Sequence, residues 1–217
     1  MIDWGYVAAI LPELVRALGV TVQATLLGMV LALVLGLLWA VLQRSTSRVA
    51  AGAARGIVEF VRSTPILVQL YFLFYVMPDL GLTLSPLATG ILALGLHYSA
   101  YTAEIYRAGI EGVPRGQWEA ALALNLGRLD TFRFVILPQA IPPVVPALGN
   151  RFIALFKDTP LLSAITVLEL LQTAKILGSE SFRYFEPLTL VGLFVLARSL
   201  LAAWAVQRLE TRLVPHG

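Results

Sequence analysis

The sequence of 217 residues contains no cysteine and few charged residues. Without cysteine, the chain has no disulfide, no thiolate metal site and no cysteine nucleophile. Charged residues make up 13% of the chain, whereas soluble domains carry about 25%. Hydrophobic residues make up 58%. This balance predicts an integral membrane protein.

Motifs of common nucleotide-binding proteins and hydrolases are also missing. The chain contains no Gly-x-x-x-x-Gly-Lys-Ser/Thr phosphate loop, no His-Glu-x-x-His zinc motif and no Gly-x-Ser-x-Gly nucleophile elbow. Residues 1–14 lack the basic start and small-residue cleavage site of a signal peptide. No linker or internal repeat is visible. We therefore expect one membrane domain over residues 1–217, and neither an enzyme nor a protein that binds ATP through a phosphate loop.

The apolar segments predict an all-α membrane fold with about five transmembrane helices, because one span needs about 20 apolar residues. Residues 1–18 predict a short interfacial helix before the first span. Gly28 and Gly36 indicate close helix packing in that span. The expected spans are residues 17–43, 57–77, 85–106, 139–157 and 187–206.

Prolines and polar residues interrupt this pattern. Pro65 predicts a break in the second span, with carbonyl groups that need new partners. The prolines at 142, 143 and 146 predict interruptions in the fourth span. Residues 159–171 predict a re-entrant or internally packed segment, and residues 172–186 predict a polar loop.

The placement of arginine predicts the orientation. Arginines gather in the first and third loops and after the last span. Asp79 is the only charged residue of the second loop, and in the fourth loop the positive and negative charges balance. Loops rich in Lys and Arg lie on the cytoplasmic side. This rule places the N-terminus outside and the C-terminus inside. The arginines concerned are Arg44, Arg48, Arg55, Arg107, Arg115, Arg128, Arg133, Arg208 and Arg212.

Residues 111–138 form a charged segment between two apolar spans. Residues 116–126 predict a short helix, and Gly127 predicts its end. A second short helix is expected to begin near Asp130, an N-cap residue type, and to run to Pro138. The local sequence fits an ordinary cytoplasmic loop equally well.

The phrase Glu119-Ala120-Ala121, followed by Leu137-Pro138, resembles the EAA loop of permease subunits in ATP-binding-cassette importers. The phrases GIEGVPRGQW at 109–118 and VILPQA at 135–140 are similar to the polar amino acid uptake subfamily. The resemblance covers about residues 19–213, with the EAA loop at 109–138. The family usually has glycine six residues after Glu119, where this chain has Asn125. Asparagine tolerates the left-handed conformation, so we expect the turn to form.

The resemblance implies a coupling role for this loop and a set of partners. In the family, the loop docks on a separate ATPase subunit that holds ATP and magnesium, so no cofactor is expected on this chain. The resemblance implies three partners: two copies of the ATPase, a second permease (identical or a sister subunit) and an extracytoplasmic amino-acid-binding protein. It also implies that the complex lies in the lipid bilayer of the inner membrane and binds no nucleic acid. The residues implied in coupling are Arg115, Gln117, Glu119, Ala120, Ala121, Asn125, Gly127 and Pro138.

The third span carries His97, Tyr98, Tyr101 and Glu104. His97, Tyr101 and Glu104 share one stripe of a helix, because spacings of four and seven return to the same face. Ionisable groups in a membrane usually face a bundle interior or a water-filled cavity. We expect these residues to line a substrate pathway. In the alternative, Glu104 pairs with Arg107 at the cytoplasmic rim.

Further pathway candidates lie near the end of the fourth span and in the last span. We expect Asn150, Asp158 and Thr159 at the pathway, because broken helices present free carbonyls and helix ends to ligands. In the alternative, Lys157 and Asp158 neutralise each other. Arg198 is isolated in the last span and needs an acidic partner; it is also a candidate to bind a carboxylate. The acids considered as its partner are Glu104, Asp158 and Glu169.

The resemblance predicts the membrane subunit of an ATP-driven importer that moves a polar or charged L-amino acid into the cytoplasm. One alternative is a secondary transporter driven by an ion gradient, in which Glu104 and Asp158 would suit proton coupling. Another is a structural membrane subunit without a transport path. The residues leave open which amino acid is carried.

Overall fold

The structure is a computed structural model that describes residues 2–213, with the side chains of residues 2–208. This described part contains helices and no strand. Its elements are α1 (Trp4–Gln43), α2 (Arg48–Ser63), α3 (Ile66–Tyr71), the π-helix η1 (Phe72–Val76), the 3-10 helix η2 (Met77–Leu80), α4 (Pro86–Glu111), α5 (Arg115–Ala123), α6 (Arg128–Asp130), the π-helix η3 (Thr131–Ile136), α7 (Leu137–Asp158), the 3-10 helix η4 (Thr159–Ile165), α8 (Leu170–Ser181) and α9 (Phe185–Leu213).

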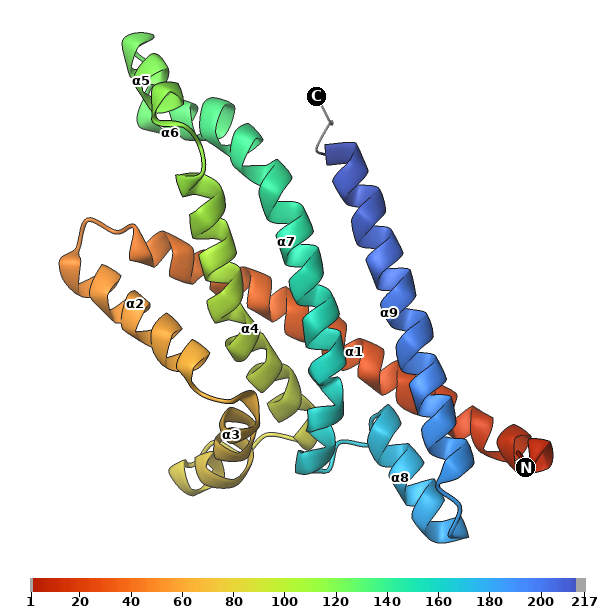
Figure 1. The fold of residues 1–217 in the computed structure, drawn as a ribbon. Helices are drawn as coiled ribbons and strands as arrows, with labels where there is room; N and C mark the ends of the chain where they lie inside the picture. The colour runs from red at the N-terminus through yellow and green to blue at the C-terminus, as the bar shows by residue number, and fades with distance from the viewer. Residues whose placement is uncertain (1, 214–217) are drawn as a thin grey trace.

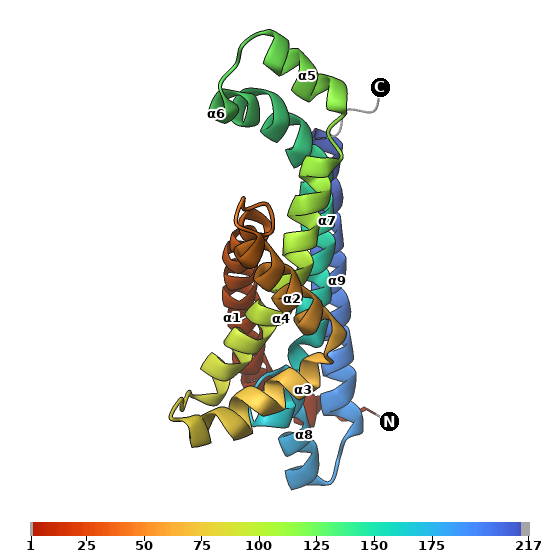
Figure 2. The ribbon, with the colours of Figure 1, turned by 90° about the vertical axis from the view of Figure 1, so that its left-hand side faces the viewer.

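The helices form an elongated bundle (Figures 1 and 2). The long helix α1 packs along α4, and α7 and α9 run side by side. The short helices α5 and α6 project at one end of the bundle, whereas α3 and α8 lie at the other end. The bundle therefore has two distinct ends, and the charged loop of the sequence forms one of them.

Small residues bring α1 and α4 into close contact. A Cβ atom at Gly36 would overlap the side chain of Thr102, and one at Gly28 would lie 3.3 Å from the Cβ atom of Leu94. The Thr102 hydroxyl donates to the carbonyl of Ala32, with 2.7 Å between the two oxygens. The close packing predicted at Gly28 and Gly36 is confirmed.

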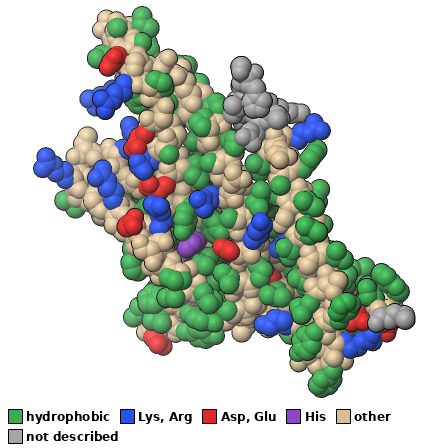
Figure 3. Space-filling view, viewed as in Figure 1, with side chains coloured by type: hydrophobic (Ala, Val, Ile, Leu, Met, Phe, Trp, Pro, Cys, Tyr) green, Lys and Arg blue, Asp and Glu red, His purple; other side chains and the backbone are tan. Residues whose placement is uncertain are grey.

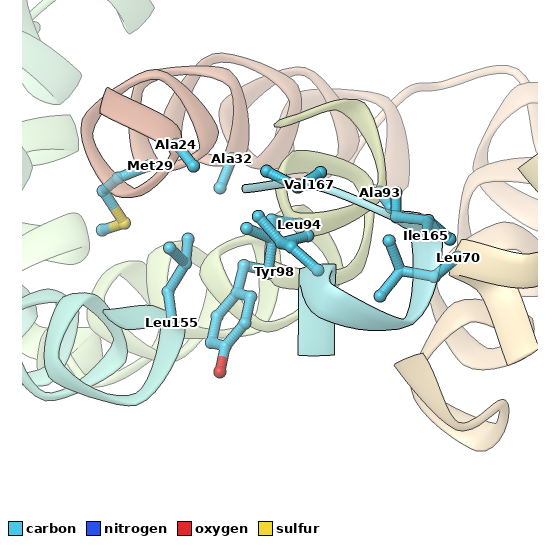
Figure 4. Packing of buried hydrophobic residues seen from close by; sticks show 11 residues of the cluster. Ala24, Met29, Ala32, Leu70, Ala93, Leu94, Tyr98, Leu155, Ile165 and Val167 are labelled. Atoms are coloured by element: carbon cyan, nitrogen blue, oxygen red, sulfur yellow. The ribbon is translucent and has the colours of Figure 1, made fainter. Parts of the chain in front are cut away.

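The largest core cluster joins α1, α3, α4, α7 and η4. Figure 4 shows the ring of Tyr98 packed beside this cluster, with its hydroxyl pointing away from the apolar side chains. One side chain thus connects the core to the polar site described below. The cluster consists of Ala24, Met29, Ala32, Leu70, Ala93, Leu94, Tyr98, Leu155, Leu162, Ile165 and Val167.

The interfacial helix expected at residues 1–18 is not a separate element. Helix α1 is continuous from Trp4 to Gln43 and contains Pro12. Ile10 and Leu14 are buried in a cluster with residues of α8 and α9. Packing against these two distant helices keeps the segment inside the bundle, and the local pattern of apolar residues does not reveal it.

The prolines at 142, 143 and 146 do not interrupt the fourth apolar segment, contrary to expectation. All three lie inside α7, which runs from Leu137 to Asp158. The fixed φ of proline is compatible with a helix, and in membrane bundles neighbouring groups can satisfy the carbonyls that proline leaves free. Helical backbone geometry is therefore kept through this proline-rich stretch.

The polar loop expected at residues 172–186 is largely helical. Helix α8 covers Leu170–Ser181. The carboxylate of Glu169 caps it by accepting from the backbone N–H groups of Leu171 and Gln172, at 2.9 and 2.7 Å. An acidic side chain at a helix N-terminus also interacts favourably with the helix dipole. This cap stabilises a short helix in a segment for which the polar composition alone predicted a loop.

Three helices in the described part of the chain are long and apolar enough to cross a membrane: Trp4–Gln43, Arg128–Ile165 and Phe185–Arg208. The pair Arg48–Ser63 and Ile66–Leu80 gives a fourth if it counts as one span, and it bends by 105°. Pro65 lies at this bend, so the predicted break there is confirmed.

Ionic contacts tie the start of α1 to the turn before α9. Arg183 donates to the carboxylates of Asp3 and Glu186, each at 3.0 Å. The Asp3 carboxylate also caps α1 by accepting from the N–H groups of Gly5 and Tyr6. The hydrogen bond from Tyr6 N–H, followed by the one from Arg183, lowers the pKa of the Asp3 carboxyl. These contacts fasten the end of the bundle opposite α5.

Candidate functional site

Charged side chains of both signs gather along α4 and α7 on the face seen in Figure 3, among hydrophobic side chains. The stripe predicted on α4 consists of His97, Tyr101 and Glu104, which follow one another along one face of the helix. The ring centroids of His97 and Tyr101 are 5.3 Å apart, and Glu104 follows one turn later. The structure therefore brings the predicted α4 residues together on one face.

The break at Pro65 contributes a side chain to this face. Gln69, in α3, donates from Nε2 to the carbonyls of Val61 and Thr64, at 2.8 and 3.1 Å. These carbonyls lie at the end of α2, where the break removes their helical partners. The other end of the Gln69 amide, Oε1, lies 3.3 Å from Nδ1 of His97. Gln69 thus joins the broken span to α4.

Two arginines flank the ring of Tyr101. The guanidinium carbon of Arg151, from α7, lies 4.8 Å from the ring centroid, and that of Arg62, from α2, lies 5.8 Å away. Cations within about 6 Å of an aromatic face are attracted by it. Tyr101 therefore lies where three helices meet, with positive charge beside it.

Glu104 belongs to an ionic network on the α5 side of this face. Arg107 donates to the Glu104 carboxylate at 2.8 Å and to Glu111 at 2.6 Å. Arg62 lies 3.8 Å from the same Glu104 oxygen, Oε2. The pairing of Glu104 with Arg107, one of the two predicted arrangements, is therefore present, and Arg62 connects it to Tyr101.

Tyr98 and Asp158 form the shortest polar contact between α4 and α7. The hydroxyl of Tyr98 donates to Oδ2 of Asp158 at 2.7 Å. The Tyr98 side chain is buried, so the carboxylate of Asp158 is held at the border of the apolar core. A hydrogen bond to a charged acceptor is stronger than a neutral one. This bond fixes the C-terminal end of α7 against the middle of α4.

The remaining predicted residues near the end of α7 differ in their surroundings. Thr159 is fully buried and donates to the carbonyl of Phe156 at 2.8 Å. Asn150 and Lys157 are exposed. Within the described residues, Lys157 forms no ion pair with Asp158, so the mutual neutralisation considered for this pair is absent from this structure. Thr159 stabilises the local turn, and Asp158 alone of this set reaches α4.

Arg198, in α9, lies over the ring of Phe156 with 3.7 Å between the guanidinium carbon and the ring centroid. Its Nη2 donates to the Phe156 carbonyl at 3.3 Å. In the described part of the chain, it forms no ion pair, and its buried Nε and Nη1 atoms have no hydrogen-bond partner. Of the three acids considered as its partner, Glu169 interacts electrostatically with Arg198 without forming a direct ion pair.

Gln69, Arg62 and Arg151 were not among the predicted pathway residues. Arg62 and Gln69 flank Pro65 in the sequence, and a proline break that frees carbonyls is a signal for a nearby side-chain donor. Arg151 lies seven residues before Asp158 on α7, so both are close to one helical face. Their positions beside α4 depend on how α2, α3 and α7 pack, which no local pattern encodes.

The charged loop forms a helical hairpin beyond the end of the bundle. Helix α5 ends in a Schellman motif: the N–H of Asn125 donates to the Leu122 carbonyl at 2.9 Å, and that of Leu126 to the Ala121 carbonyl at 3.1 Å. Asn125 has a φ of 53°. The left-handed turn predicted at Asn125 is confirmed.

Three details of the predicted hairpin are wrong. Gly127 does not end α5; it has a φ of −61° and precedes α6. Asp130 lies inside the helical segment instead of capping it, and Pro138 is in the first turn of α7 instead of ending a helix. Asn125 already ends α5. Pro138 lies in the first turn of α7, where the N–H that proline lacks is not required. The helical elements therefore follow one another without interruption from Arg128 into α7.

The outer surface of this hairpin is mixed in character. Glu119, Ala120, Arg115 and Gln117 are exposed, whereas Ala121 is buried in the hairpin itself. Gln139 donates to Oε1 of Gln117 at 3.3 Å. Large apolar side chains are also exposed here, namely Leu122, Leu124, Leu129 and Phe134. Exposed apolar patches on a projecting element are typical of protein interaction sites.

A family model described as the binding-protein-dependent transport system inner membrane component matches residues 32–215. The probable amino-acid ABC transporter permease protein y4tG of Sinorhizobium fredii (strain NBRC 101917 / NGR234) is 45% identical over 215 residues, which are 99% of this chain and 93% of that protein. The glutamine transport system permease protein GlnP of Escherichia coli (strain K12) is 33% identical over 213 residues, or 97% of each protein.

Solved structures share the same fold. A chain from the crystal structure of an amino acid ABC transporter with histidines matches with a TM-score of 0.92 and 32% identity, over 98% of this chain and 99% of that one. A chain of the inward-facing MetNI methionine ABC transporter matches with a TM-score of 0.79 and 22% identity, over 95% and 98%. With the helical hairpin and the family match, these findings show that the chain belongs to the family of binding-protein-dependent transport system inner membrane components.

Proposed function

We propose that this chain forms part of the translocation pathway of an ATP-driven importer that carries a polar or charged amino acid into the cytoplasm. Its relatives are named as amino-acid permeases. The ATPase of such a system is a separate component to which ATP binds, and the permease subunit carries no cofactor. Family membership favours this function over the ion-gradient alternative.

The hydrogen bond between Tyr98 and Asp158 is the observation that carries the pathway proposal. It holds a carboxylate between α4 and α7 inside the bundle, at 2.7 Å from the tyrosine oxygen. Carboxylates at membrane depth usually mark substrate or ion pathways. Asp158 and Glu104 would attract the ammonium group of an amino acid, while His97, Tyr98 and Tyr101 would line its path.

Arg198 is the proposed contact for the carboxylate of the substrate. Its Nε and Nη1 atoms are buried donors without partners in the described part of the chain, and guanidinium groups bind carboxylates with two parallel hydrogen bonds. Thr159 supports this region, because its hydroxyl donates to the carbonyl of Phe156 and the ring of Phe156 lies under Arg198. Asn150 is proposed to face the pathway from α7.

The hairpin of α5 and α6 is the proposed docking element for the ATPase. Glu119 and Ala120 are exposed in the middle of α5, and the exposed apolar side chains of the hairpin offer a surface that a protein can cover. Ala121, Asn125, Gly127 and Pro138 would keep the shape of the hairpin, and Arg115 and Gln117 would contact the partner or brace α5. Two ATPase copies would dock on two permease subunits, identical or sister chains.

Five membrane crossings are proposed, with the N-terminus outside. Helices α1, α4 and α9 run toward the end that carries α5, and α2 and α7 run the opposite way (Figures 1 and 2). The arginine-rich loops then lie on the α5 side, which the positive-inside rule assigns to the cytoplasm. An external binding protein would deliver substrate at the α8 end, and closure of the ATPases would move the hairpins together to open the pathway outward.

Co-purification of the full chain from its membrane tests the docking proposal. The variant Glu119→Arg is expected to lose the associated ATPase and ATP-dependent uptake, because it reverses the charge on the exposed surface of α5. Glu180→Arg is the matched control for retention of the ATPase: Glu180 is also an exposed helical glutamate, but it lies in α8 at the other end. Retention of a stoichiometric ATPase by Glu119→Arg would contradict the docking role.

A further inference from the structure

A long apolar groove lies where the C-terminal end of α1 meets α4 and the start of α7. It has a volume of about 610 Å³, within the range of about 300–1,000 Å³ that is typical of ligand sites. Its walls include Leu37 and Val41 from α1, Tyr106 and Ile110 from α4, and Ile141 from α7. The lining is mostly hydrocarbon, so the groove suits an aliphatic chain.

A smaller polar pocket of about 360 Å³ adjoins this groove. Arg44 and Ser45 line both spaces, so one ligand can occupy the two together. The polar pocket is completed by Gln43, Arg55, Arg107 and Glu111. Glu111 is already paired with Arg107 at 2.6 Å, which leaves the charges of Arg44 and Arg55 uncompensated by an acid in the described part of the chain.

Gln43 provides an independent sign of a missing ligand. Its side chain is 95% buried, and its Nε2 atom has no hydrogen-bond partner in the described part of the chain. The Glu104 carboxylate interacts with this amide, but the two groups do not have the geometry of a hydrogen bond. A buried N–H donor without an acceptor costs about 1–3 kcal/mol. An oxygen-rich group in the pocket would satisfy it.

We propose that these two spaces bind one anionic phospholipid, with an acyl chain in the groove and the phosphate at Arg44, Arg55 and the Gln43 amide. The positive charge of the polar pocket is complementary to the phosphate of such a lipid, and the apolar wall of the groove is complementary to its acyl chain. Basic pockets between transmembrane helices on the cytoplasmic side bind anionic headgroups, and the proposed orientation places Arg44 there. A soluble phosphate compound would use the polar pocket and leave the groove empty. A second permease copy would have to supply acids to two arginines that have no acidic partner in the described part of the chain.

Lipid retention by the purified transporter complex tests this proposal without reference to transport. The complex is equilibrated in detergent with equal phosphatidylglycerol and phosphatidylcholine, washed, and its bound lipid is quantified by mass spectrometry. We expect the wild type to retain phosphatidylglycerol in excess. Arg44→Gln is expected to lower that excess about fivefold, because one arginine near an anionic lipid contributes about 1 kcal/mol.

Matched variants separate this site from general surface charge. Arg48→Gln removes the same charge from the same loop, but Arg48 lines neither space, so its retention should equal that of the wild type. Ile141→Trp keeps both arginines and fills the groove, and it should also lower retention. The proposal fails if Arg44→Gln and Arg48→Gln lose equal amounts of lipid, if Ile141→Trp and Arg44→Gln both retain wild-type amounts, or if glycerol phosphate displaces the lipid.

Discussion

Tyr98 shows how one side chain can belong to the apolar core and to a polar site. Its ring packs beside Leu94 and Leu155 (Figure 4), and its hydroxyl donates to Asp158. The ring and the hydroxyl can be separated experimentally, because phenylalanine keeps the first and lacks the second. This makes Tyr98 a better probe of the pathway than Asp158, whose removal would leave a buried hydroxyl unpaired.

Tyr98→Phe is expected to lower ATP-dependent uptake in proteoliposomes about tenfold, since a hydrogen bond to a charged group contributes about 1.5–3 kcal/mol. Assembly with the ATPase should be kept, because the ring remains in the core, whereas loss of the bond between α4 and α7 should lower the thermal stability somewhat. Tyr75→Phe serves as the control, as Tyr75 is exposed and lies in η1, away from Asp158. Normal uptake by Tyr98→Phe would mean that this bond is only structural.

At the scale of single elements, two features of the backbone decide how helices meet. Helix α5 can turn back toward α6 because Asn125 adopts the left-handed conformation. Helices α1 and α4 can approach because Gly36 has no Cβ atom. In both cases a small or permissive residue gives the chain a geometry that most residues would oppose.

Asn125→Val is expected to weaken the coupling of ATP hydrolysis to uptake, because a β-branched residue is strained at positive φ by roughly 1–2 kcal/mol. Asn125→Gly should couple as well as the wild type, since glycine adopts this conformation freely. The ratio of transported substrate to hydrolysed ATP in proteoliposomes measures the effect. Equal ratios for the valine and glycine variants would show that the Schellman motif does not matter for coupling.

Gly36→Ala is expected to destabilise the protein by about 1–3 kcal/mol, the usual range for overpacking, because its Cβ atom would overlap Thr102. Gly19→Ala in the same helix is the control: no atom lies within 4 Å of its added Cβ, and alanine is the better helix former. Thermal unfolding in detergent compares the two. A Gly36→Ala protein as stable as Gly19→Ala would contradict the close contact of α1 and α4.

At the scale of the whole molecule, the two ends of the bundle differ in composition and contacts. One end carries the hairpin of α5 and α6, and the other carries α8 and the network of Asp3, Arg183 and Glu186. The asymmetry agrees with the proposed arrangement, in which an ATPase docks on one side of the membrane and an external partner on the other.

Single cysteines can test the proposed orientation, because the natural sequence contains none. Ser179→Cys in α8 should react with a membrane-impermeant maleimide added to spheroplasts. Thr46→Cys, in the loop between α1 and α2, should react only after the membrane is permeabilised. Both positions are exposed, so unequal reaction reports the side of the membrane. Labelling of Thr46→Cys in intact spheroplasts would reverse the proposed topology.

Much of the fold class and the family could be predicted from the sequence by itself. Apolar composition determines that the chain enters a membrane, since few other structures can bury so many apolar side chains. The phrase around Glu119 predicted the family, and Asn125 and Pro65 predicted a left-handed turn and a break, because these are local backbone effects. The stripe of His97, Tyr101 and Glu104 also followed from helical periodicity alone.

The tertiary structure decided which distant residues meet. Only the packing of α4 against α2, α3 and α7 brings Gln69, Arg62 and Arg151 to the predicted stripe. Burial of Ile10 and Leu14 by α8 and α9 makes α1 one long helix, and the apolar groove exists because the end of α1 lies beside the start of α7. Such contacts depend on the orientations of whole helices, which arise from the sum of many weak interactions along the chain.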